Sequence, residues 1–596
     1  ANEYVYFTTL DIENIFKSCG QDIEEQILLH FVKLLQSKGA LSVNISEELI
    51  HEMFVESNGH FMVADANDNN PLLVHDGVTA CHYLSGRWAD KILDEIANFL
   101  DYKGEEKQLS VEESKDVMIK VMGYLENEAK QILSTGSTAK MLENCLALHH
   151  AMIYWSRLTN FRYDIISQAY HYIGSEFKNQ AKYLNDYTEM NILSQGLIEY
   201  IIQSDFHSDE ASFCINTFDR LFAIMHHIVN MGMYFDLLNN GQADSEIVLL
   251  KNGRIVFPKM IENINIPYFT TLRKRTMEYR EVLVRQHQLL PRYEVDRTEK
   301  KFKEAFKAEF GLAIDVLFDI QGRSIDYANK AGNPIVVISK ESFEEKILAE
   351  CLGAELFRMF YEHFVLSKNA YKEMPVSEKL LQRYNRSVQL SSRPWVLYED
   401  KILYSVKSIY VSCQILLERV DAGTIKHNSK LMRNYIGNIS EKKGHLFTQN
   451  LGKYFKSLEE EDIKVNMEVQ ICPGKPLCAE ENLGDIDVLL IDSKRKKIVC
   501  IEAKDYYCAR TIYDMISQNI KIEKALPKVI RRDEWCREHR DLFKFYSKDI
   551  DESYEVKTVF LTYEEPTYKY FKHSVEYPIT MLSAFDIIKD YHIVFQ

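Results

Sequence analysis

Two apolar runs on either side of a short charged segment constrain the fold of this chain more than any other feature. Gly484–Asp492 and Ile498–Tyr506 are rich in β-branched residues, and a turn-sized polar segment separates them. This pattern predicts a β-hairpin. If its turn is centred on Lys494–Lys497, then Asp487 and Glu502 lie directly opposite each other, with Cβ atoms about 4.5–5.5 Å apart.

Directly opposed carboxylates need a counter-charge, because like charges across a sheet are destabilising. A divalent cation between Asp487 and Glu502 would remove this cost. Mg²⁺ (or Mn²⁺) suits hard oxygen ligands combined with substrate phosphate oxygens. Lys504 shares the strand face of Glu502, since side chains alternate along a strand. Aspartate, glutamate and lysine around one ion are what metal-assisted phosphodiester hydrolysis requires, because the ion activates water and the lysine stabilises developing charge.

The spacing Asp-x14-Glu-x-Lys on a hairpin resembles that of the PD-(D/E)xK nucleases, the restriction-endonuclease-like superfamily. Gly484–Asp487 is similar to the Gly-Glu-Ile-Asp variant of the motif, in which the second acid is the metal ligand. The resemblance covers roughly residues 440–596, and the run Leu483–Arg510 also resembles large bacterial proteins with such a domain at the C-terminus. It implies catalysis by Asp487, Glu502 and Lys504, and metal binding by Asp487, Glu502 and the Ala503 carbonyl.

A Glu-x-Lys triplet alone carries little information, because most such triplets are solvated charge pairs. The triplet that begins at Glu502 differs in its apolar strand and in its symmetric partner Asp487. The competing interpretation is an exposed hairpin whose acids and lysine are surface charges. Other copies of the triplet begin at Glu105, Glu344, Glu399 and Glu555.

The residues around the hairpin predict the element order α-β-β-β-α-β, which is the core of the superfamily. A helix is expected over Gly444–Glu460, after a polar joint over Asn434–Lys443. Family members often carry an acid on this helix, in a pattern like Arg-Gly-x-x-Phe-Glu. This chain has Thr448 at that position, a departure that calls into question either a second metal ion or the efficiency of the site. The other elements are strands over Lys464–Ile471 and Val556–Leu561, and a helix over Thr511–Ala525 that Pro527 interrupts.

The second helix and the residues after it supply candidate nucleic-acid contacts. Some superfamily members place a glutamine near the site on this helix, which makes Gln518 a candidate, with a plain surface glutamine as the alternative. A basic cluster follows Pro527 and would track a phosphate backbone. The alternative for the cluster is an ordinary charged helix face. It contains Lys528, Arg531, Arg532, Arg537 and Arg540.

Two further regions are predicted upstream of a C-terminal domain over 434–596. Residues 1–245 are expected to be a mainly α-helical regulatory or recognition region, and 246–433 a mixed α/β region. Two adjacent-histidine pairs, His149–His150 and His226–His227, are expected to be packed rather than metal-bound, because neighbours on a helix point in different directions. The first region has predicted helices over Ile23–Leu35, Ser110–Leu133, Ala139–Leu158, Tyr163–Leu184, Glu189–Ser204 and Ala211–Leu238, and a loop at Asn67–Pro71.

The middle region is predicted from shorter patterns. Hairpins are expected at Ser245–Pro258, around an Asn-Gly turn, and at Trp395–Tyr404. The charged span 270–310 is expected to form an exposed helix or helix pair. The remaining elements are a strand over Pro334–Ser339 and helices over Ser342–Phe364 and Tyr410–Val420.

Composition bounds these assignments. The 596 residues suffice for two to four domains. The net charge is −16, yet from residue 431 onward 26 Lys and Arg stand against 28 Asp and Glu, so the acidity lies in the first 430 residues. The 11 cysteines show no zinc-ligand spacing. Without a long apolar run or a leader-like N-terminus, the chain is expected to be cytoplasmic, with reduced thiols and no membrane partner.

The leading hypothesis is a metal-dependent nuclease that acts on DNA in bacterial restriction or anti-phage defence, with RNA as a less favoured substrate. The alternative is a degenerate nuclease fold that binds nucleic acid or protein as a subunit of a larger complex. Thr448 favours the alternative, and the set Asp487, Glu502 and Lys504 opposes it. In either case the helical region is expected to bind a protein partner or a second copy of the chain.

Overall fold

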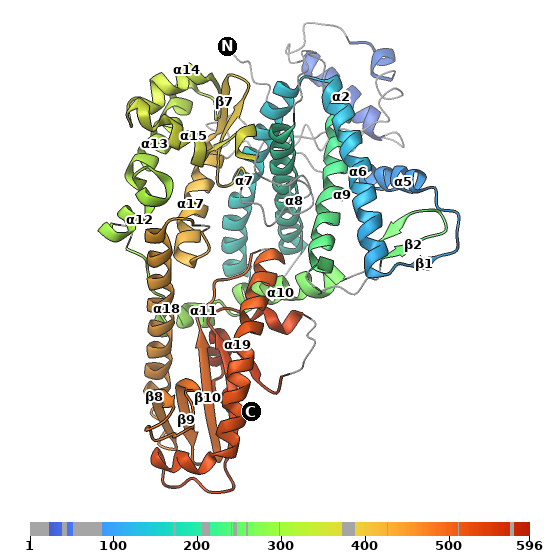
Figure 1. Cartoon of the computed structure of the whole chain (residues 1–596). Coiled ribbons are helices and arrows are strands. Elements are labelled where there is room, and N and C mark those ends of the chain that lie inside the picture. Colours follow the sequence, from blue (N-terminus) through green and yellow to red (C-terminus); the bar gives the residue numbers. More distant parts are fainter. Residues whose placement is uncertain are drawn as a thin grey trace.

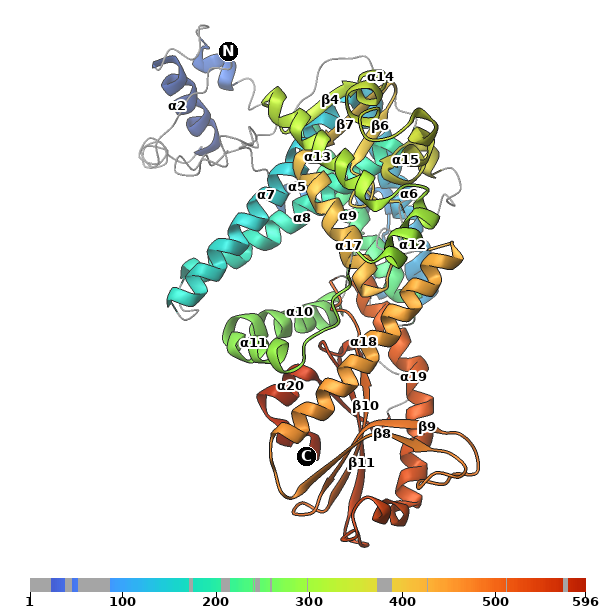
Figure 2. The same cartoon turned by 90° about the vertical axis from the view of Figure 1, so that its left-hand side faces the viewer.

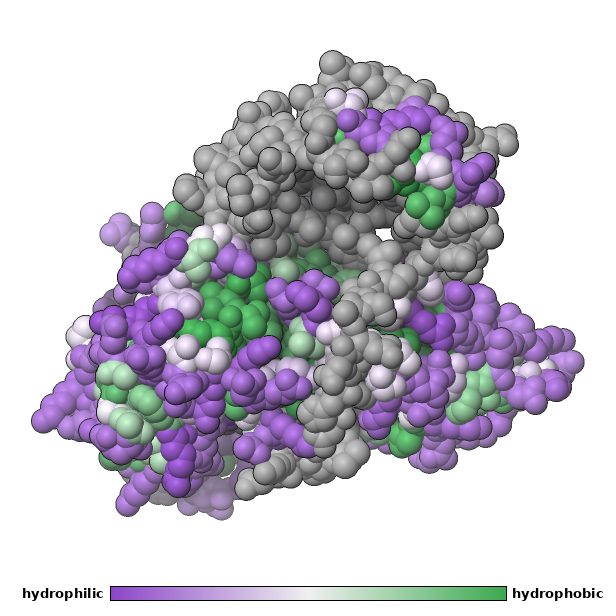
Figure 3. Space-filling model, turned by 90° about the horizontal axis from the view of Figure 1, so that it is seen from above, coloured by the Kyte–Doolittle hydropathy of each residue, from purple (hydrophilic) through white to green (hydrophobic). Residues whose placement is uncertain are grey.

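The chain is multidomain, with a helical body at one end and a sheet flanked by two long helices at the other (Figure 1). Seen from above, the described part of its surface is mostly hydrophilic, and apolar residues gather in patches on it (Figure 3). The predicted loop Asn67–Pro71 lies outside the residues that the structure describes. The computed structural model describes residues 23–37, 45–51, 86–170, 175–204, 215–239, 241, 247–257, 260–296, 298–371, 388–425, 427–510, 512–571 and 577–596.

Long helices form the described part of the N-terminal region, as predicted. They stand side by side, and α7 and α8 form a pair that projects away from the rest (Figures 1 and 2). Helix α6 begins with a capping box: Ser110 Oγ accepts from the Glu113 N–H at 3.2 Å, and the Glu113 carboxylate accepts from the Ser110 N–H at 3.0 Å. The helices are α2 (Ile23–Ser37), α5 (Gly86–Leu100), α6 (Val111–Thr135), α7 (Thr138–Tyr170), α8 (Ser175–Gln203) and α9 (Ile215–Asn239).

Two predicted helix boundaries in this region are wrong. The structure has one helix, α7, where the sequence predicts a break between Leu158 and Tyr163. It also has one helix, α8, where a break is predicted between Leu184 and Glu189. Neither interval contains glycine or proline, so nothing in the backbone ends the helix there.

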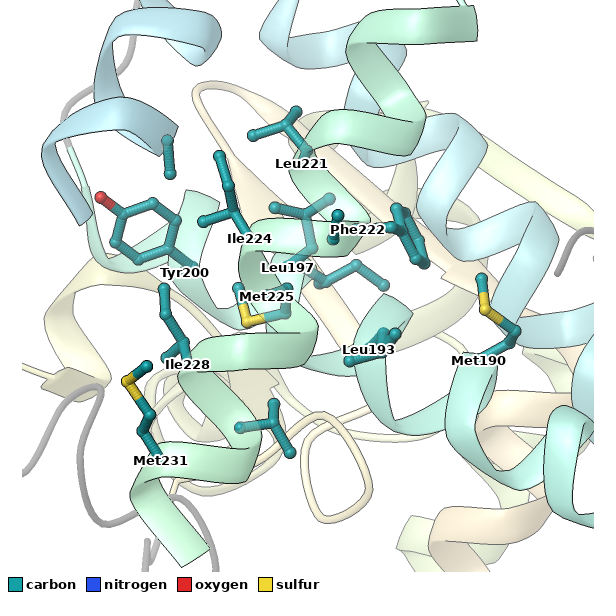
Figure 4. Packing of buried hydrophobic residues seen from close by; sticks show 14 of the residues in the cluster. Met190, Leu193, Leu197, Tyr200, Leu221, Phe222, Ile224, Met225, Ile228 and Met231 are labelled. Atoms are coloured by element: carbon teal, nitrogen blue, oxygen red, sulfur yellow. The ribbon is translucent and has the colours of Figure 1, made fainter. Parts of the chain in front are cut away.

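Helices α5 to α9 share one apolar core. Met190 and Leu197 of α8 and Phe222 and Met225 of α9 are among its buried residues (Figure 4). The stretch Thr217–Asn239 is long and apolar enough, by length and composition, to span a membrane, and 78% of its apolar window is buried inside the fold. Burial of this kind is typical of a core helix.

The adjacent-histidine pairs are packed, as predicted. Nδ1 of His149 lies 3.0 Å from the hydroxyl of Ser408 in the middle region, and Nδ1 of His226 lies 2.5 Å from the carboxylate of Glu189. Burial lowers the pKa of both His149 and His227 to about 4, so these rings are neutral at physiological pH. Neutral His149 links α7 to Ser408, and neutral His227 links α9 to the Ala89 carbonyl of α5.

Two small sheets confirm the strands predicted in the middle of the chain. One has the order β4-β7-β6-β5, and the other has the order β1-β2-β3. Gly253, with φ of 80°, forms the expected tight turn between β2 and β3. The strands are β1 (Lys107–Gln108), β2 (Val248–Leu249), β3 (Ile255–Val256), β4 (Ile335–Ser339), β5 (Val365–Leu366), β6 (Trp395–Tyr398) and β7 (Lys401–Ser405).

The expected helix Ser342–Phe364 is wrong as a single element. The chain forms α14 (Lys340–Phe343), a π-helical turn and a 3-10 turn before α15 (Phe357–Phe364). Gly353 lies at the break, and glycine is a poor helix residue. The other helices of this part are α10 (Met260–Glu278), α11 (Arg280–Leu289), α12 (Lys300–Phe310), α13 (Ile314–Ala331) and α17 (Val406–Ala422).

The expected polar joint Asn434–Lys443 is also wrong, because α18 (Lys430–Ser457) runs through it. Tyr435 in its first half belongs to the core of the middle region, and Leu451 in its second half belongs to the core under the C-terminal sheet. The polar residues that suggested a joint are the exposed face of an amphipathic helix. The predicted domain boundary at 433/434 therefore falls inside a helix that two cores share (Figure 2).

A five-stranded sheet in the order β12-β11-β10-β9-β8 organises the C-terminal region. The pairs β8–β9 and β9–β10 are antiparallel, and the pairs β10–β11 and β11–β12 are parallel. The sequence of elements is α18, β8, β9, β10, α19 and β11, as predicted. The elements are β8 (Ile463–Ile471), β9 (Gly484–Asp492), β10 (Lys497–Lys504), α19 (Ile512–Glu538), β11 (Glu555–Thr562), β12 (Thr580–Ser583) and α20 (Ala584–Lys589).

Helix α19 does not end at Pro527, contrary to the prediction. Proline removes one N–H donor and crowds the preceding turn, which costs helix stability. Leu526 and Val529, on either side of Pro527, are buried with Phe560 of β11, so tertiary packing outweighs this cost. The continuous helix carries residues far beyond Pro527 along the sheet.

Helices α10 and α11 belong to the C-terminal body in space, although they precede it by many residues in sequence. Leu290, directly after α11, is fully buried in the core between α18 and the sheet. Arg275 of α10 is buried and pairs with Glu565 and with Asp586, the latter at 3.1 Å. The span 270–310, predicted to be exposed, thus contains a buried arginine and a buried leucine.

Candidate active site

The β9–β10 hairpin has the register that the sequence predicts. Its pairs run from Asp492 with Lys497 to Val488 with Ile501. Continuing the same register by one position places Asp487 opposite Glu502, just beyond the last pair of the ladder. The polar residues between the strands form the turn, in which Lys496 has φ of 54°.

The sheet departs from regular geometry at the position of Asp487. Strand β8 pairs with β9 on either side of this position, but the ladder skips Glu468 and Asp487, and Glu468 has φ of 52°. Asp487 Oδ2 instead accepts a hydrogen bond from the Ala503 N–H of β10 at 2.7 Å. The carboxylate therefore takes the place of a backbone partner and is held against the end of β10.

Glu502 is the centre of a charge cluster, and its side chain is only 12% exposed. Lys504 Nζ lies 2.6 Å from Oε1 of Glu502. Arg532 of α19 donates from Nη2 to Oε2 of the same carboxylate and from Nη1 to the Asp485 carbonyl. Both oxygens of Glu502 thus have a cationic partner.

Lys504 links the two acids, because its Nζ also lies 4.0 Å from Oδ2 of Asp487. Burial raises the pKa of Asp487 to about 6, Glu502 adds to the increase, and Lys504 opposes it. Burial would likewise raise the pKa of Glu502, but Lys504 and Arg532 outweigh burial and hold it below its ordinary value. The two carboxyls therefore differ in proton affinity although they are neighbours.

Lys504 is a cation rather than a base in this arrangement. Burial tends to lower the pKa of its amine, but the attraction of Glu502 and Asp487 raises that pKa above its ordinary value. A protonated lysine beside two acids can stabilise a developing negative charge. It cannot accept a proton from water.

A cavity of about 10 Å³ lies beside Glu502, roughly the space that one water molecule needs. The cavity lies between β10 and α19, next to the charge cluster. Its walls are Ile486, Cys500, Ile501, Glu502, Val529, Arg532, Cys536 and Thr558.

The carboxylate oxygens at this site suit one divalent cation that takes few ligands from the protein. Mg²⁺ binds through one or two carboxylates and takes its other ligands from water and phosphate, and Asp487 and Glu502 supply two such carboxylates. No group of three or more histidine, cysteine, aspartate or glutamate side chains suited to a metal ion occurs in the described segments. Thr448, where the sequence resemblance predicts a further acid, is buried on α18. An ion here would share Glu502 with two cationic side chains.

The predicted nucleic-acid contacts fall into three classes. Gln518 is fully buried, where its Nε2 donates to the Tyr507 carbonyl at 3.0 Å and its Oε1 accepts from the Thr567 N–H at 3.1 Å, so its assignment to nucleic-acid binding is corrected to a structural one. Arg532 is buried in the charge cluster and is not a surface contact. Lys528 and Arg531 are exposed beside the site, and Arg531 pairs with Glu481.

Sequence reasoning missed Arg292, which follows α11. Its guanidinium lies 2.7 Å from Asp505 and 2.8 Å from Glu564, and it stacks over the Tyr563 ring at 4.0 Å. It also donates to the Tyr506 carbonyl at 2.7 Å. Arg292 thereby fixes the chain just after Lys504. No motif marks it, because its partners are more than 200 residues away in sequence.

Inference about function rests on these residues and their arrangement. No protein-family model, no curated protein and no solved structure matches this chain.

Proposed function

We propose that this chain is a metal-dependent nuclease of the PD-(D/E)xK type. The observation that carries the proposal is the convergence of Asp487, Glu502 and Lys504 at the end of one hairpin, with Lys504 Nζ 4.0 Å and 2.6 Å from the two carboxylates. The element order α18, β8, β9, β10, α19 and β11 supports it, because that order is the core of the family that the sequence resembles.

Each residue has a distinct task in the proposed reaction. Asp487 and Glu502 would hold one Mg²⁺ or Mn²⁺ ion, with the Ala503 carbonyl as a further ligand, and the ion supplies activation of water and polarisation of the phosphate. Lys504 stays protonated and stabilises the charge that develops on the phosphate oxygens. Lys528 and Arg531, exposed on α19, would contact the phosphate backbone. DNA is the proposed substrate, and restriction or anti-phage defence in a bacterial cytoplasm the proposed setting.

The test is cleavage by the full chain with Mg²⁺ or Mn²⁺ of linear, supercoiled and single-stranded DNA, and of single-stranded RNA. Lys504→Ala is expected to reduce the rate by about 10²–10³-fold, as does loss of a group that stabilises charge in a transition state. Lys494→Ala, an exposed lysine in the turn of the same hairpin, is the matched control and is expected to be unchanged. Equal cleavage by wild type and Lys504→Ala would contradict the assignment.

A second function, nucleic-acid or protein binding without cleavage, is favoured by one feature of the site. Both oxygens of Glu502 already have cationic partners, Lys504 and Arg532, so the cluster is neutralised without a metal ion. Binding of nucleic acid by wild type with no cleavage under any divalent ion would support this alternative. The helical region would then carry the function, by binding a protein partner or a second copy of the chain.

A further inference from the structure

Arg532, the buried arginine of the site, has no role in the proposed reaction. The side chain of Arg532 is 8% exposed and reaches from α19 across to both strands of the hairpin. It donates to the Glu502 carboxylate and to the Asp485 carbonyl at the start of β9. A hypothetical Cβ on Gly484, also at the start of β9, would lie 3.6 Å from Nη1 of Arg532, in ordinary van der Waals contact.

Arg532 and Glu502 need each other in the absence of a metal ion. Burial of an unpaired charge is strongly unfavourable, and each of these groups supplies the counter-charge of the other. A divalent cation bound to Glu502 would compete for the oxygen that Arg532 holds. It would also be repelled by the guanidinium, because the two charges have the same sign at a separation of a few ångströms in a partly dry site.

We propose that Arg532 is the resident counter-cation of the acidic pair, and that its charge weakens the binding of a divalent ion at Asp487 and Glu502 until a substrate phosphate adds negative charge. The inference rests on the proposed metal site and names what regulates it. An ion and a phosphodiester would then bind together, because the phosphate offsets the excess positive charge that Arg532, Lys504 and the ion create. Loading of the free protein with metal would be weak for the same reason.

Direct binding of Mn²⁺ to the full chain tests this inference without measuring cleavage. Free Mn²⁺ is followed by electron paramagnetic resonance in wild type, Arg532→Gln and Arg532→Lys. Arg532→Gln, which removes the charge, is expected to bind Mn²⁺ at least ~10-fold more tightly. Arg532→Lys keeps the charge and is expected to stay within about 3-fold of wild type. Lys524→Gln, an exposed lysine on the same helix, controls for net charge and is expected to change little.

Two further variants keep the test decisive. Arg532→Met preserves length and suits the apolar walls that Ile486 and Val529 provide, so it serves if Arg532→Gln does not fold, as judged by near-ultraviolet circular dichroism. Glu502→Gln combined with Arg532→Gln is expected to lose the gain in Mn²⁺ affinity, because the shared oxygen ligand is gone.

The outcomes separate failure of the inference from failure of the proposed function. If wild type binds Mn²⁺ and Arg532→Gln binds it equally or more weakly, Arg532 orients Glu502 for the ion and the counter-cation role is wrong, while the metal site stands. If neither wild type nor the neutral variants bind Mn²⁺, with or without a phosphodiester oligonucleotide, the metal site is wrong and the inference falls with it. Tighter binding by Arg532→Gln, abolished by adding Glu502→Gln, supports both.

Discussion

At the scale of single residues, the site combines two carboxyls that neighbouring contacts drive apart in pKa. Asp487, with one backbone donor and a lysine at 4.0 Å, has a pKa of about 6. Glu502, with a cation on each oxygen, has a pKa below its ordinary value. The sequence predicted that the two acids would meet. It could not predict which of them would be the weaker acid, because Arg532 comes from a helix whose position depends on the whole sheet.

Asp487→Asn is expected to stabilise the metal-free protein at neutral pH while abolishing the proposed activity. The folded-state pKa of about 6 lies above the ordinary value of 3.8. The unfolded state therefore loses its proton first, and stability falls as pH rises from about 4 to about 6. Asparagine removes this penalty, and its carbonyl can still accept from the Ala503 N–H.

The measurement is the thermal midpoint of wild type and Asp487→Asn with a chelator at pH 4.5 and pH 8. The variant is expected to gain about 1–3 kcal/mol at pH 8 and little at pH 4.5, since a shift of one pKa unit corresponds to ~1.4 kcal/mol. A variant less stable than wild type at pH 8 would contradict this prediction, because it would show that the charge of Asp487 stabilises the folded protein.

At the scale of elements, helix ends that capping residues or a following glycine mark in the sequence were predicted well. Helix α6 starts at its capping box and α17 ends before Gly423, which has φ of 67°. Most failures were breaks inferred from polarity or from a single proline, and one, Ser342–Phe364, was a predicted helix that the structure divides. The interval Asn434–Lys443 is polar on one face of α18 only, and Pro527 lies on the exposed side of α19. Local sequence can start a helix, but packing decides whether the helix continues.

Ser110→Ala is expected to lower the stability of α6 by about 1 kcal/mol, because it removes the side chain that accepts from the Glu113 N–H. Hydrogen exchange of the amides in the first turn of α6 is expected to accelerate. Ser134→Ala, at the other end of the same helix, is the control, because Ser134 is exposed and bonds only to the preceding Gln131 carbonyl at 2.8 Å. Equal acceleration of exchange in both variants would contradict a specific role for the cap.

At the scale of the whole molecule, the C-terminal body is completed by residues from outside its own sequence. Leu290 fills the core between α18 and the sheet, and Arg292 holds the chain after Lys504. The core of the N-terminal helices in turn includes Met515 near the start of α19. The three predicted regions are thus joined through shared helices, and the charge cluster lies on elements that two regions stabilise.

Leu290→Ala is expected to destabilise the C-terminal body by about 2–5 kcal/mol, because it leaves a cavity at a fully buried position. Hydrogen exchange is expected to accelerate in β10 and β11 and to remain unchanged in α9. Val284→Ala, on the exposed face of α11, is the matched control and is expected to change stability by less than about 0.5 kcal/mol. No acceleration in β10 after Leu290→Ala would mean that α11 is not part of this folding unit.

The sequence by itself determined the hairpin, its register and the meeting of Asp487, Glu502 and Lys504, because these depend on alternation along two adjacent strands and on the length of one turn. It also determined where capped helices begin and that the histidine pairs are packed. Only the tertiary structure decided that Arg532 shares Glu502, that Gln518 is buried and that Arg292 clamps the end of β10. These contacts join residues that no local pattern relates, so they exist only once the helices and the sheet have packed.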